Sequence, residues 1–528
     1  MLMTRPSIPV LLHTVASILA LGFGFVSPGL VHAQIFSGTL TDAVKLTLRQ
    51  DASIASSYQQ INASQGQLLS ARAPFDRLWN AGVSQQLSYT PIPASGGAAL
   101  ASRQAGYSAG VSQLLESGVV LNPTVSVNRI RDDAANSTAP STSNVALNIV
   151  VPLRKGAGRD VTTAPVTAAA LSLEASRSSY LHTQAQAVTR TVTAYWDVVA
   201  GHQSLDLALQ AEARAGELLA NARKLARADE IPKADLLKYE VRREGQESDR
   251  LRSALLLRQA LQALSQAMNT PIETLEAAPR GLDAFPKTED AQLGLLDDPV
   301  AVARLLTSGA ENRSDIRAAE QRLRAADTLA DAARNNSSTQ LDLGLSVGYS
   351  GMTEGRAGAA ALLALGQPAR GPNLGLTLNY TLPSGDFARR GLILQREAAA
   401  EQAQTDLEFL RLRVRGDMQT QLDALRAAIA QLDKASTQRR LQTAVYENEK
   451  RSYRSGLSTL LDLFTTESQL TAYQTGWVQA QRDFARALIL FRFQTASLLS
   501  PGTDGAARLD ENLLQAGSLT TLPKEFFR

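Results

Sequence analysis

The stretch Gln340–Ser350 reads QLDLGLSVGYS, and its apolar residues fall on every second position. Asp342 and Ser346 lie between them. Because successive side chains of a strand point to opposite faces, this period of two predicts a β-strand with one apolar face and one polar face. The residues on the apolar side are Leu341, Leu343, Leu345, Val347 and Tyr349.

The same alternation recurs along the chain. In the first half we expect strands at about 77–90, 107–115, 118–130 and 144–153, and in the second half at about 339–350 and 374–383. The segments Asp132–Ser143 and Gly351–Asn373 are rich in Ser, Ala, Gly and Pro, and are typical of exposed loops.

Two environments suit such strands. In a water-soluble sandwich the apolar faces would meet a second layer of protein, whereas in a membrane barrel they would meet lipid and Ser84, Asp342 and Ser346 would face a wet lumen. From Trp79 to Tyr89 the strand would be about 34 Å long, so when tilted it would cross an apolar band of roughly 25 Å with an aromatic residue near each edge.

Long segments without internal proline separate the strands and predict helices. Two of them would be roughly 90–100 Å long at 1.5 Å per residue, which suits a rod or a tube and not a compact globule. An isolated antiparallel bundle is the alternative. The helices are expected at about 40–72, 166–227, 233–268, 299–334, 387–454 and 460–499.

The two halves of the chain match each other. A shift of 262 residues places Ile54 on Ile316, and a shift of 227 places Asp235 on Asp462. An internal repeat of this length decides the architecture. We expect a first repeat at 34–269, a linker at 270–298, a second repeat at 299–502 and a tail at 503–528.

The first 33 residues differ from the rest. Arg5 precedes an apolar run, and Val31-His32-Ala33 follows Pro28 and Gly29, which predicts a secretory signal peptide at 1–33 that is cut after Ala33. An uncleaved anchor helix is the alternative. Acidic and basic residues are mixed along the chain with a net charge of +3, so the charge pattern does not indicate nucleic acid as a partner.

The composition offers little for catalysis. The chain has no cysteine and only four histidines, and His182 and His202 lie too far apart in one predicted helix to converge. We therefore expect no enzyme activity, no cofactor and no metal site.

The segment between the last two predicted helices carries a recognisable pattern. Tyr453-Arg-Ser-Gly-Leu-Ser-Thr-Leu-Leu-Asp462 resembles the turn of the TolC family of outer-membrane efflux channels, as does Val151-Pro-Leu-Arg-Lys-Gly156 before the long helix. The resemblance covers nearly all of residues 37–502.

The resemblance implies a mostly α fold with a β-barrel part. The duplicated helix–strands–long helix–helix repeat would form an α-helical periplasmic tube and a trimeric outer-membrane β-barrel. The homotrimer would be a passive exit duct, in a tripartite efflux pump or a type I secretion line, for small molecules or polypeptides. Its partners would be outer-membrane lipid, a periplasmic adaptor and an inner-membrane pump. A periplasmic coiled-coil structural or adaptor protein is the alternative.

The resemblance also implies functional residues. Asp235 and Asp462 match tip aspartates of the family, and Tyr453 and Gly456 match its turn. Arg454 or Lys233 would substitute for the missing basic partner of a latch. The other interpretation is that both aspartates cap helix N-termini.

The strand count departs from the family, which has two strands in each half. The segments near 107–115 and 118–130 would either widen the barrel or form a hairpin outside it.

Overall fold

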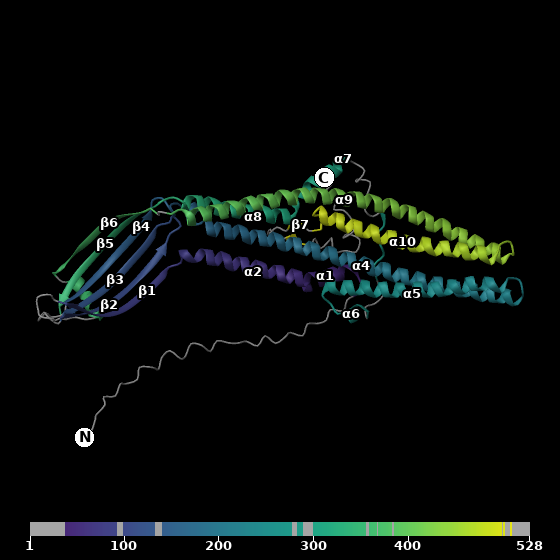
Figure 1. Ribbon diagram of the computed structural model, residues 1–528, viewed down its shortest axis with the longest axis horizontal. Coiled ribbons are helices and arrows are strands. Elements are labelled where there is room, and N and C mark those ends of the chain that lie inside the picture. Colours follow the sequence, from purple (N-terminus) through teal and green to yellow (C-terminus); the bar gives the residue numbers. More distant parts are fainter. Residues whose placement is uncertain are drawn as a thin grey trace, which may run out of the picture.

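A computed structural model describes residues 37–91, 99–132, 140–276, 282–288, 299–354, 358–366, 368–382, 385–498, 500–501 and 507–508. The predicted signal peptide at 1–33 lies outside these residues, as do parts of the predicted linker and most of the predicted tail. The molecule is elongated, with one β-sheet at one end and helix pairs running away from it to the other end (Figure 1).

Each half of the chain contributes helices, then strands, then a helical hairpin. The elements of the first half are α1 (Leu40–Gln50), α2 (Ala52–Arg72), η1 (Ala73–Phe75), β1 (Leu78–Pro91), β2 (Ala99–Leu114), β3 (Val120–Asp132), β4 (Pro140–Pro152), α3 (Arg159–Thr162), α4 (Ala164–Arg227), α5 (Lys233–Met268) and α6 (Ile272–Glu276). The elements of the second half are α7 (Pro299–Asn312), α8 (Ser314–Asn336), β5 (Gln340–Glu354), η4 (Gly358–Gly366), β6 (Arg370–Thr381), α9 (Phe387–Arg454), α10 (Leu460–Gln494), β7 (Ser500–Pro501) and β8 (Ala507–Arg508).

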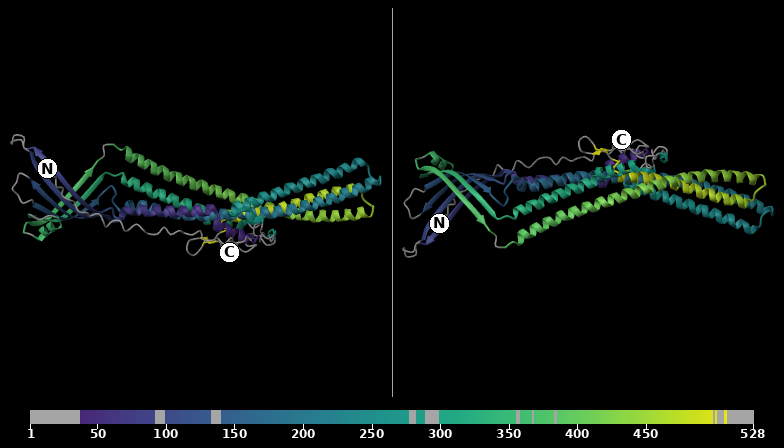
Figure 2. Two further views of the ribbon diagram at one scale, coloured as in Figure 1. Left: turned by 90° about the horizontal axis from the view of Figure 1, so that it is seen from below. Right: turned by 90° about the horizontal axis from the view of Figure 1, so that it is seen from above.

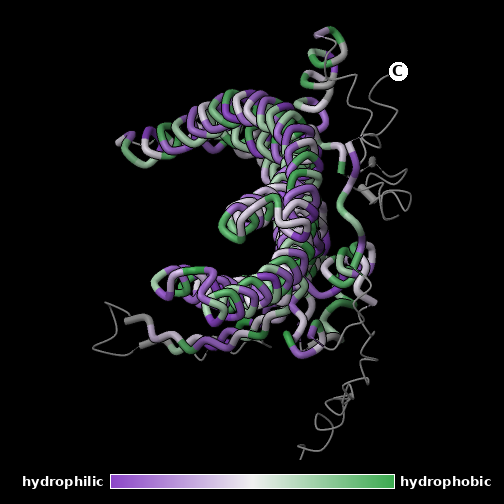
Figure 3. Tube along the Cα trace, turned by 90° about the vertical axis from the view of Figure 1, so that its right-hand side faces the viewer, coloured by the Kyte–Doolittle hydropathy of each residue, from purple (hydrophilic) through white to green (hydrophobic). Residues whose placement is uncertain are grey.

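The long helices form a single curved wall. Next to the sheet the order of neighbours is α2–α4–α8–α9, and towards the far end α5 and α10 replace α2 and α8 beside the two long helices. Seen along the long axis, the wall is an arc that is open on one side (Figure 3). None of the helices in the described ranges is both long and apolar enough to cross a bilayer.

All six long strands belong to one antiparallel sheet in the order β1–β2–β3–β4–β5–β6 (Figure 2). The segments predicted near 107–115 and 118–130 are β2 and β3, and they lie inside this sheet between β1 and β4. The first-half hairpin is therefore part of the sheet and not an appendage. Among the described residues, β1 and β6 have no strand on their outer sides, so the sheet ends in two free edges.

The duplication is visible in the backbone. The stretches expected as single helices at 40–72 and 299–334 are each divided at equivalent places, because Asp51 and Arg313 have extended backbone and begin α2 and α8. The ends of α5 and α10 also correspond, since Asn269 and Ala496, 227 residues apart, both have left-handed backbone, with φ of 50° and 55°.

The main core lies midway along the molecule. Tyr195 and Trp196 of α4 are buried there against α1 and residues of α5 and α10. The Tyr195 hydroxyl donates to the carbonyl of Gly38 over 2.9 Å, which holds the chain entering α1 against the wall. This core holds α4 near its middle, so that the sheet lies at one end of this helix and a hairpin turn at the other.

Candidate functional site

The two faces of the sheet differ in character. The strand register places Trp79, Tyr89, Leu341, Leu343, Leu345 and Tyr349 on one face. Most of the large side chains on this apolar face are open to the surroundings; Trp79 is 81% exposed and Leu374 is 79% exposed. Such an extent of exposed apolar surface marks an interaction face.

The opposite face carries small and polar residues. Ser84, Asp342 and Ser346, predicted to face a lumen, all lie on it. Asp342 accepts a hydrogen bond from the side chain of Gln340 over 2.7 Å. The three residues lie on strands at both sides of the sheet, so they mark a polar surface and not a single pocket.

Close packing shows which face is concave. A Cβ atom at Gly106 would come 2.7 Å from the Ser84 hydroxyl, and one at Gly110 would come 2.8 Å from Asn80. Gly344 and Gly375 are crowded in the same way by Thr377 and Ser346. All these glycines are on the polar face. Because side chains converge on the inside of a curved sheet, the small residues on the polar face and the large side chains on the apolar face indicate that the polar face is the inner one.

The far end of the wall consists of two hairpin turns with the same geometry. Gly456, after α9, has a φ of 71°, and Asp229, 227 residues earlier, has a φ of 55°. In each turn the third residue beyond the helix donates its N–H back to a carbonyl in the last helical turn: Leu457 to Ser452 and Glu230 to Leu225, both over 2.9 Å. This is the Schellman pattern of helix ends, in which a glycine is the usual left-handed residue.

The two predicted tip aspartates have helix-terminal roles in the structure. Asp462 forms a capping box with Thr459, whose backbone N–H donates to the carboxylate over 3.1 Å, while the backbone N–H of Asp462 donates to the Thr459 hydroxyl. The Thr459 hydroxyl also donates to this carboxylate over 2.6 Å, and this hydrogen bond, together with the one from the Thr459 backbone N–H, lowers the pKa of Asp462. Asp235 lies in the first turn of α5 and pairs with Lys238 over 2.8 Å. Both carboxylates lie beside the hairpin turns.

The other predicted tip residues do not form a latch within one chain. Tyr453 packs into a cluster with Tyr239 and Phe464. Lys233 and Arg454 are exposed, and within the described ranges neither makes a hydrogen bond or an ion pair with Asp235 or Asp462.

A buried charge cluster behind the tip joins three helices. The Glu467 side chain of α10 is fully buried, and it accepts from Arg214 Nε of α4 and from Arg242 Nη2 of α5, each over 3.0 Å. The hydroxyl of Thr471 donates to the same carboxylate over 2.9 Å. No pattern in the sequence predicted this cluster, although Glu467 interrupts an apolar stripe formed by Leu460, Leu463 and Leu470.

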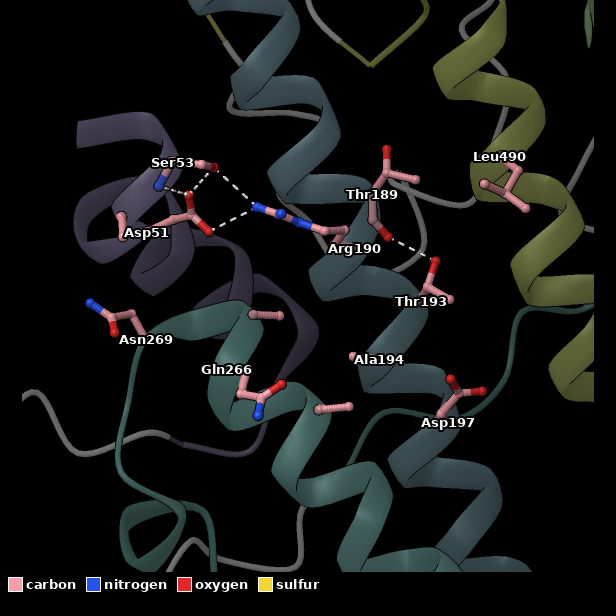
Figure 4. A pocket seen from close by; sticks show the side chains of 13 residues that line it. Asp51, Ser53, Thr189, Arg190, Thr193, Ala194, Asp197, Gln266, Asn269 and Leu490 are labelled. Carbon is pink, nitrogen blue, oxygen red and sulfur yellow. Dashed lines mark hydrogen bonds and ion pairs between the residues drawn. The ribbon is translucent and has the colours of Figure 1, made fainter. Parts of the chain in front are cut away.

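A hollow of about 650 Å³ lies where α1 gives way to α2 (Figure 4). Asp51 accepts from the backbone N–H groups of Ser53 and Ile54, and Arg190 of α4 donates to it over 3.1 Å. On the other side of the hollow, burial raises the pKa of Asp197. The Asp51 cluster thus caps α2 and ties it to α4. In the described ranges, no group of three or more His, Asp or Glu residues is arranged to hold a metal.

The arrangement defines a class of protein. A curved wall of long helices continues into an antiparallel sheet that is polar inside and apolar outside. Solved structures of outer-membrane channels have this fold. The channel OprN aligns with a TM-score of 0.63 at 15% identity, covering 86% of this chain and 89% of that one. The CmeC outer membrane channel of Campylobacter jejuni aligns with a TM-score of 0.61 at 14% identity, covering 92% and 90%. The open state of the MtrE outer membrane channel of Neisseria gonorrhoeae aligns with a TM-score of 0.58 at 17% identity, covering 86% and 88%.

The sequence itself matches one family. Residues 305–493, within the second repeat, match the family described as outer membrane efflux protein. No curated protein matches the chain in sequence. The predicted resemblance to the TolC-like outer-membrane efflux proteins is thus confirmed, as is the predicted fold class of a mostly helical chain with an antiparallel sheet. The proteins that it resembles are channels and not enzymes.

Proposed function

We propose that three copies of this chain form an exit channel in the outer membrane that extends into the periplasm. One observation carries the proposal: a curved sheet with an exposed apolar outer face and a polar inner face ends in two free edges. Unpaired strand edges cannot face hydrocarbon, so the sheet must close by pairing with further copies. In the closed barrel the apolar face, with Trp79 and Leu341, would contact lipid, and Asp342 would line the pore.

The far hairpin turns would then face the periplasm and dock to partners. A periplasmic adaptor and an inner-membrane pump would bind there, in a tripartite efflux pump or a type I secretion system. Asp235 and Asp462 from three chains would place a ring of carboxylates at the aperture, which favours cations. Capping a helix and attracting cations are compatible, since the lowered pKa keeps the exposed Asp462 carboxylate charged at neutral pH.

Cross-linking of the free edges tests the barrel. The chain has no cysteine, so introduced cysteines are the only reactive thiols. We would pair Val83→Cys on β1 with cysteine at Leu374, Leu376 or Leu378 on β6, one double variant at a time, and treat outer-membrane fractions with a short bifunctional maleimide. Covalent dimers and trimers are expected from at least one pair.

The matched control joins two strands inside one sheet. Val125 of β3 lies directly opposite Val145 of β4, so cysteines at these positions should link within one chain and give no ladder of oligomers. If none of the β1–β6 pairs gives oligomers, or if the protein is recovered from the soluble periplasm as a monomer, the channel proposal is wrong. Loss of the predicted signal peptide, with a new N-terminus at Gln34, is expected in the same fractions.

A further inference from the structure

Charged residues are divided between the two faces of the sheet. The arginines in the six strands are Arg103, Arg129, Arg131 and Arg370, and the register places all four on the apolar outer face. The acidic residues of the strands, Asp132, Asp342 and Glu354, lie on the polar inner face. An arginine on a lipid-facing surface is costly at mid-membrane and costs little near the interface, so its height along the strand matters.

The arginines lie at the end of the sheet that is distant from the helices. Arg103 stands opposite Leu87 of β1, nine residues from Leu78 at the helix end. At about 3.4 Å per residue and a tilt of about 40°, this places Arg103 roughly 23 Å above that end, at the upper border of an apolar band of about 25 Å. Arg103 and its partner Arg131 therefore lie at the height of the headgroups in the outer leaflet, and Arg129 lies two residues nearer the helices.

Three of the arginines are neighbours. Arg103 of β2 and Arg131 of β3 are directly paired across the strands, and Arg129 follows two residues along β3 on the same face. Directly opposed like charges are destabilising. Within the described ranges none of the three has an acidic partner, and the Nε of Arg129 is buried without a hydrogen-bond partner. The cluster therefore lacks the anion that would offset its repulsion.

A short apolar helix lies beside this cluster on the same face. The segment η4, GAAALLALG, connects β5 to β6 and packs over the outer face of β4 and β5. The Ser143 hydroxyl donates to the carbonyl of Ala361 over 2.7 Å, and Gly351 leaves room for Ala364. Ala361 and Ala364 are buried against the sheet, whereas Leu362 and Leu363 are exposed. The segment thus adds apolar side chains that point away from the barrel wall.

We propose that Arg103, Arg129 and Arg131, together with η4, form a binding surface for the phosphorylated glycolipid of the outer leaflet, lipopolysaccharide. The guanidinium groups would bind its phosphates, for which arginine has a matching donor geometry. Leu362 and Leu363 would contact its acyl chains. Basic pockets flanked by apolar surface are how membrane proteins bind anionic headgroups. The proposal rests on the proposed function, because only in an outer-membrane barrel does this face meet lipid.

The test measures lipid binding to the intact oligomer. Purified protein in detergent is titrated with lipopolysaccharide carrying both lipid A phosphates, with the same material after enzymatic dephosphorylation, and with phosphatidylglycerol, and bound lipid is counted by native mass spectrometry. Wild-type protein should bind the phosphorylated glycolipid at least about tenfold more tightly than either of the others, since each tenfold step needs only one good charged contact.

Variants assign the effect to the cluster. Replacing Arg103, Arg129 and Arg131 together with Gln should reduce binding to the level of the dephosphorylated lipid. The triple change to Lys, which keeps the charge and removes the bidentate geometry, should give an intermediate affinity. The matched control neutralises Arg77 and Arg154 at the helix end of the sheet and should bind like wild type.

Equal binding of phosphorylated and dephosphorylated glycolipid would overturn the inference, as would unchanged binding by the Gln variant. Binding of phosphatidylglycerol as tightly as lipopolysaccharide also overturns it, because a general preference for anionic lipid would explain the result. A protein that cross-links into trimers yet shows no lipid preference defeats this inference alone. A protein that forms no oligomer defeats the proposed function instead.

Discussion

The buried carboxylate behind the tip makes a quantitative prediction. Glu467 links three helices, since Arg214 lies on α4, Arg242 on α5 and Glu467 itself on α10. These helices belong to the two hairpins of the repeat. Replacing Glu467 with Gln keeps the size of the side chain and removes its charge, so the substitution isolates the electrostatic link between the hairpins.

The size of the effect follows from burial. Removing one partner of a buried ion pair costs about 3–5 kcal/mol, because the remaining charge is left unpaired. Here the side chains of Arg214 and Arg242 are 19% and 21% exposed, so water can still reach them in part. The amide oxygen of Gln can also still accept one hydrogen bond. We therefore expect the lower end, about 3 kcal/mol, which corresponds to a factor of about 10² in the equilibrium for local opening of the hairpins.

Hydrogen exchange of the purified oligomer measures this opening. Protection of backbone amides in α10 near Glu467, and in the facing parts of α4 and α5, should fall about 10²-fold in the Glu467→Gln variant, while protection in the sheet should not change. The control is Glu240→Gln at the repeat-equivalent position. Glu240 pairs with Arg223 on the surface, where their side chains are 39% and 53% exposed, so this change should cost at most about 1 kcal/mol. Similar losses in the two variants, or none at Glu467→Gln, would refute the reasoning.

Three further predictions concern the tip and the outer face. Asp462→Asn should lower the cation preference of conductance in planar bilayers at pH 7. The folded-state pKa of Asp462 is lowered, so the wild-type cation preference and the capping contribution to stability should be fully present above the ordinary carboxyl pKa. Both should disappear only as the pH falls through the lowered pKa. Reversal potentials at pH 7, 5 and 3 would measure the change in cation preference. Asp229→Gly should raise the thermal unfolding temperature through a net gain of about 0.5–1 kcal/mol, because the left-handed strain it relieves, about 1–2 kcal/mol, exceeds the extra backbone entropy that glycine loses; Gly456→Asp should lower it. Gly351→Ala should displace η4, so that a cysteine at Ala364 becomes reactive to maleimide only in that background.

Local periodicity made much of the architecture predictable. The alternation around Leu341 and Trp79 indicated the strands because it depends only on which side chains share a face. The repeat was visible for a similar reason, since residues such as Asp235 and Asp462 keep their places over a shift of 227. Asp229 shows the limit of comparing residue types between the repeats. The second repeat has Gly456 at the equivalent position, yet the backbone of both residues is left-handed.

Contacts between segments that are distant in the sequence could not be predicted from local patterns. The apolar stripe of α10 makes Glu467 conspicuous, but its partners lie 253 and 225 residues away, and no local pattern pairs them. The small residues of Gly351–Asn373 predict an exposed loop, and this prediction is wrong. In the structure the first residues extend β5, the last begin β6, and η4 between them packs on the outer face through Ala361 and Ala364. That packing depends on Ser143 and Gly351, which face it only after the sheet has formed.

The width of the sheet gives the hairpin of β2 and β3 a function in the proposed channel. Four helices packed 8–10 Å apart span roughly 32–40 Å of wall. Six strands spaced about 4.8 Å apart and tilted by about 40° span roughly 38 Å, whereas four strands at the same tilt would span only about 25 Å. With β2 and β3 in place, the sheet therefore continues the helical wall at equal width. In the proposed trimer the bore would not narrow where helices pass into strands, and the selectivity of the duct would arise at the helical tip, where Asp235 and Asp462 lie.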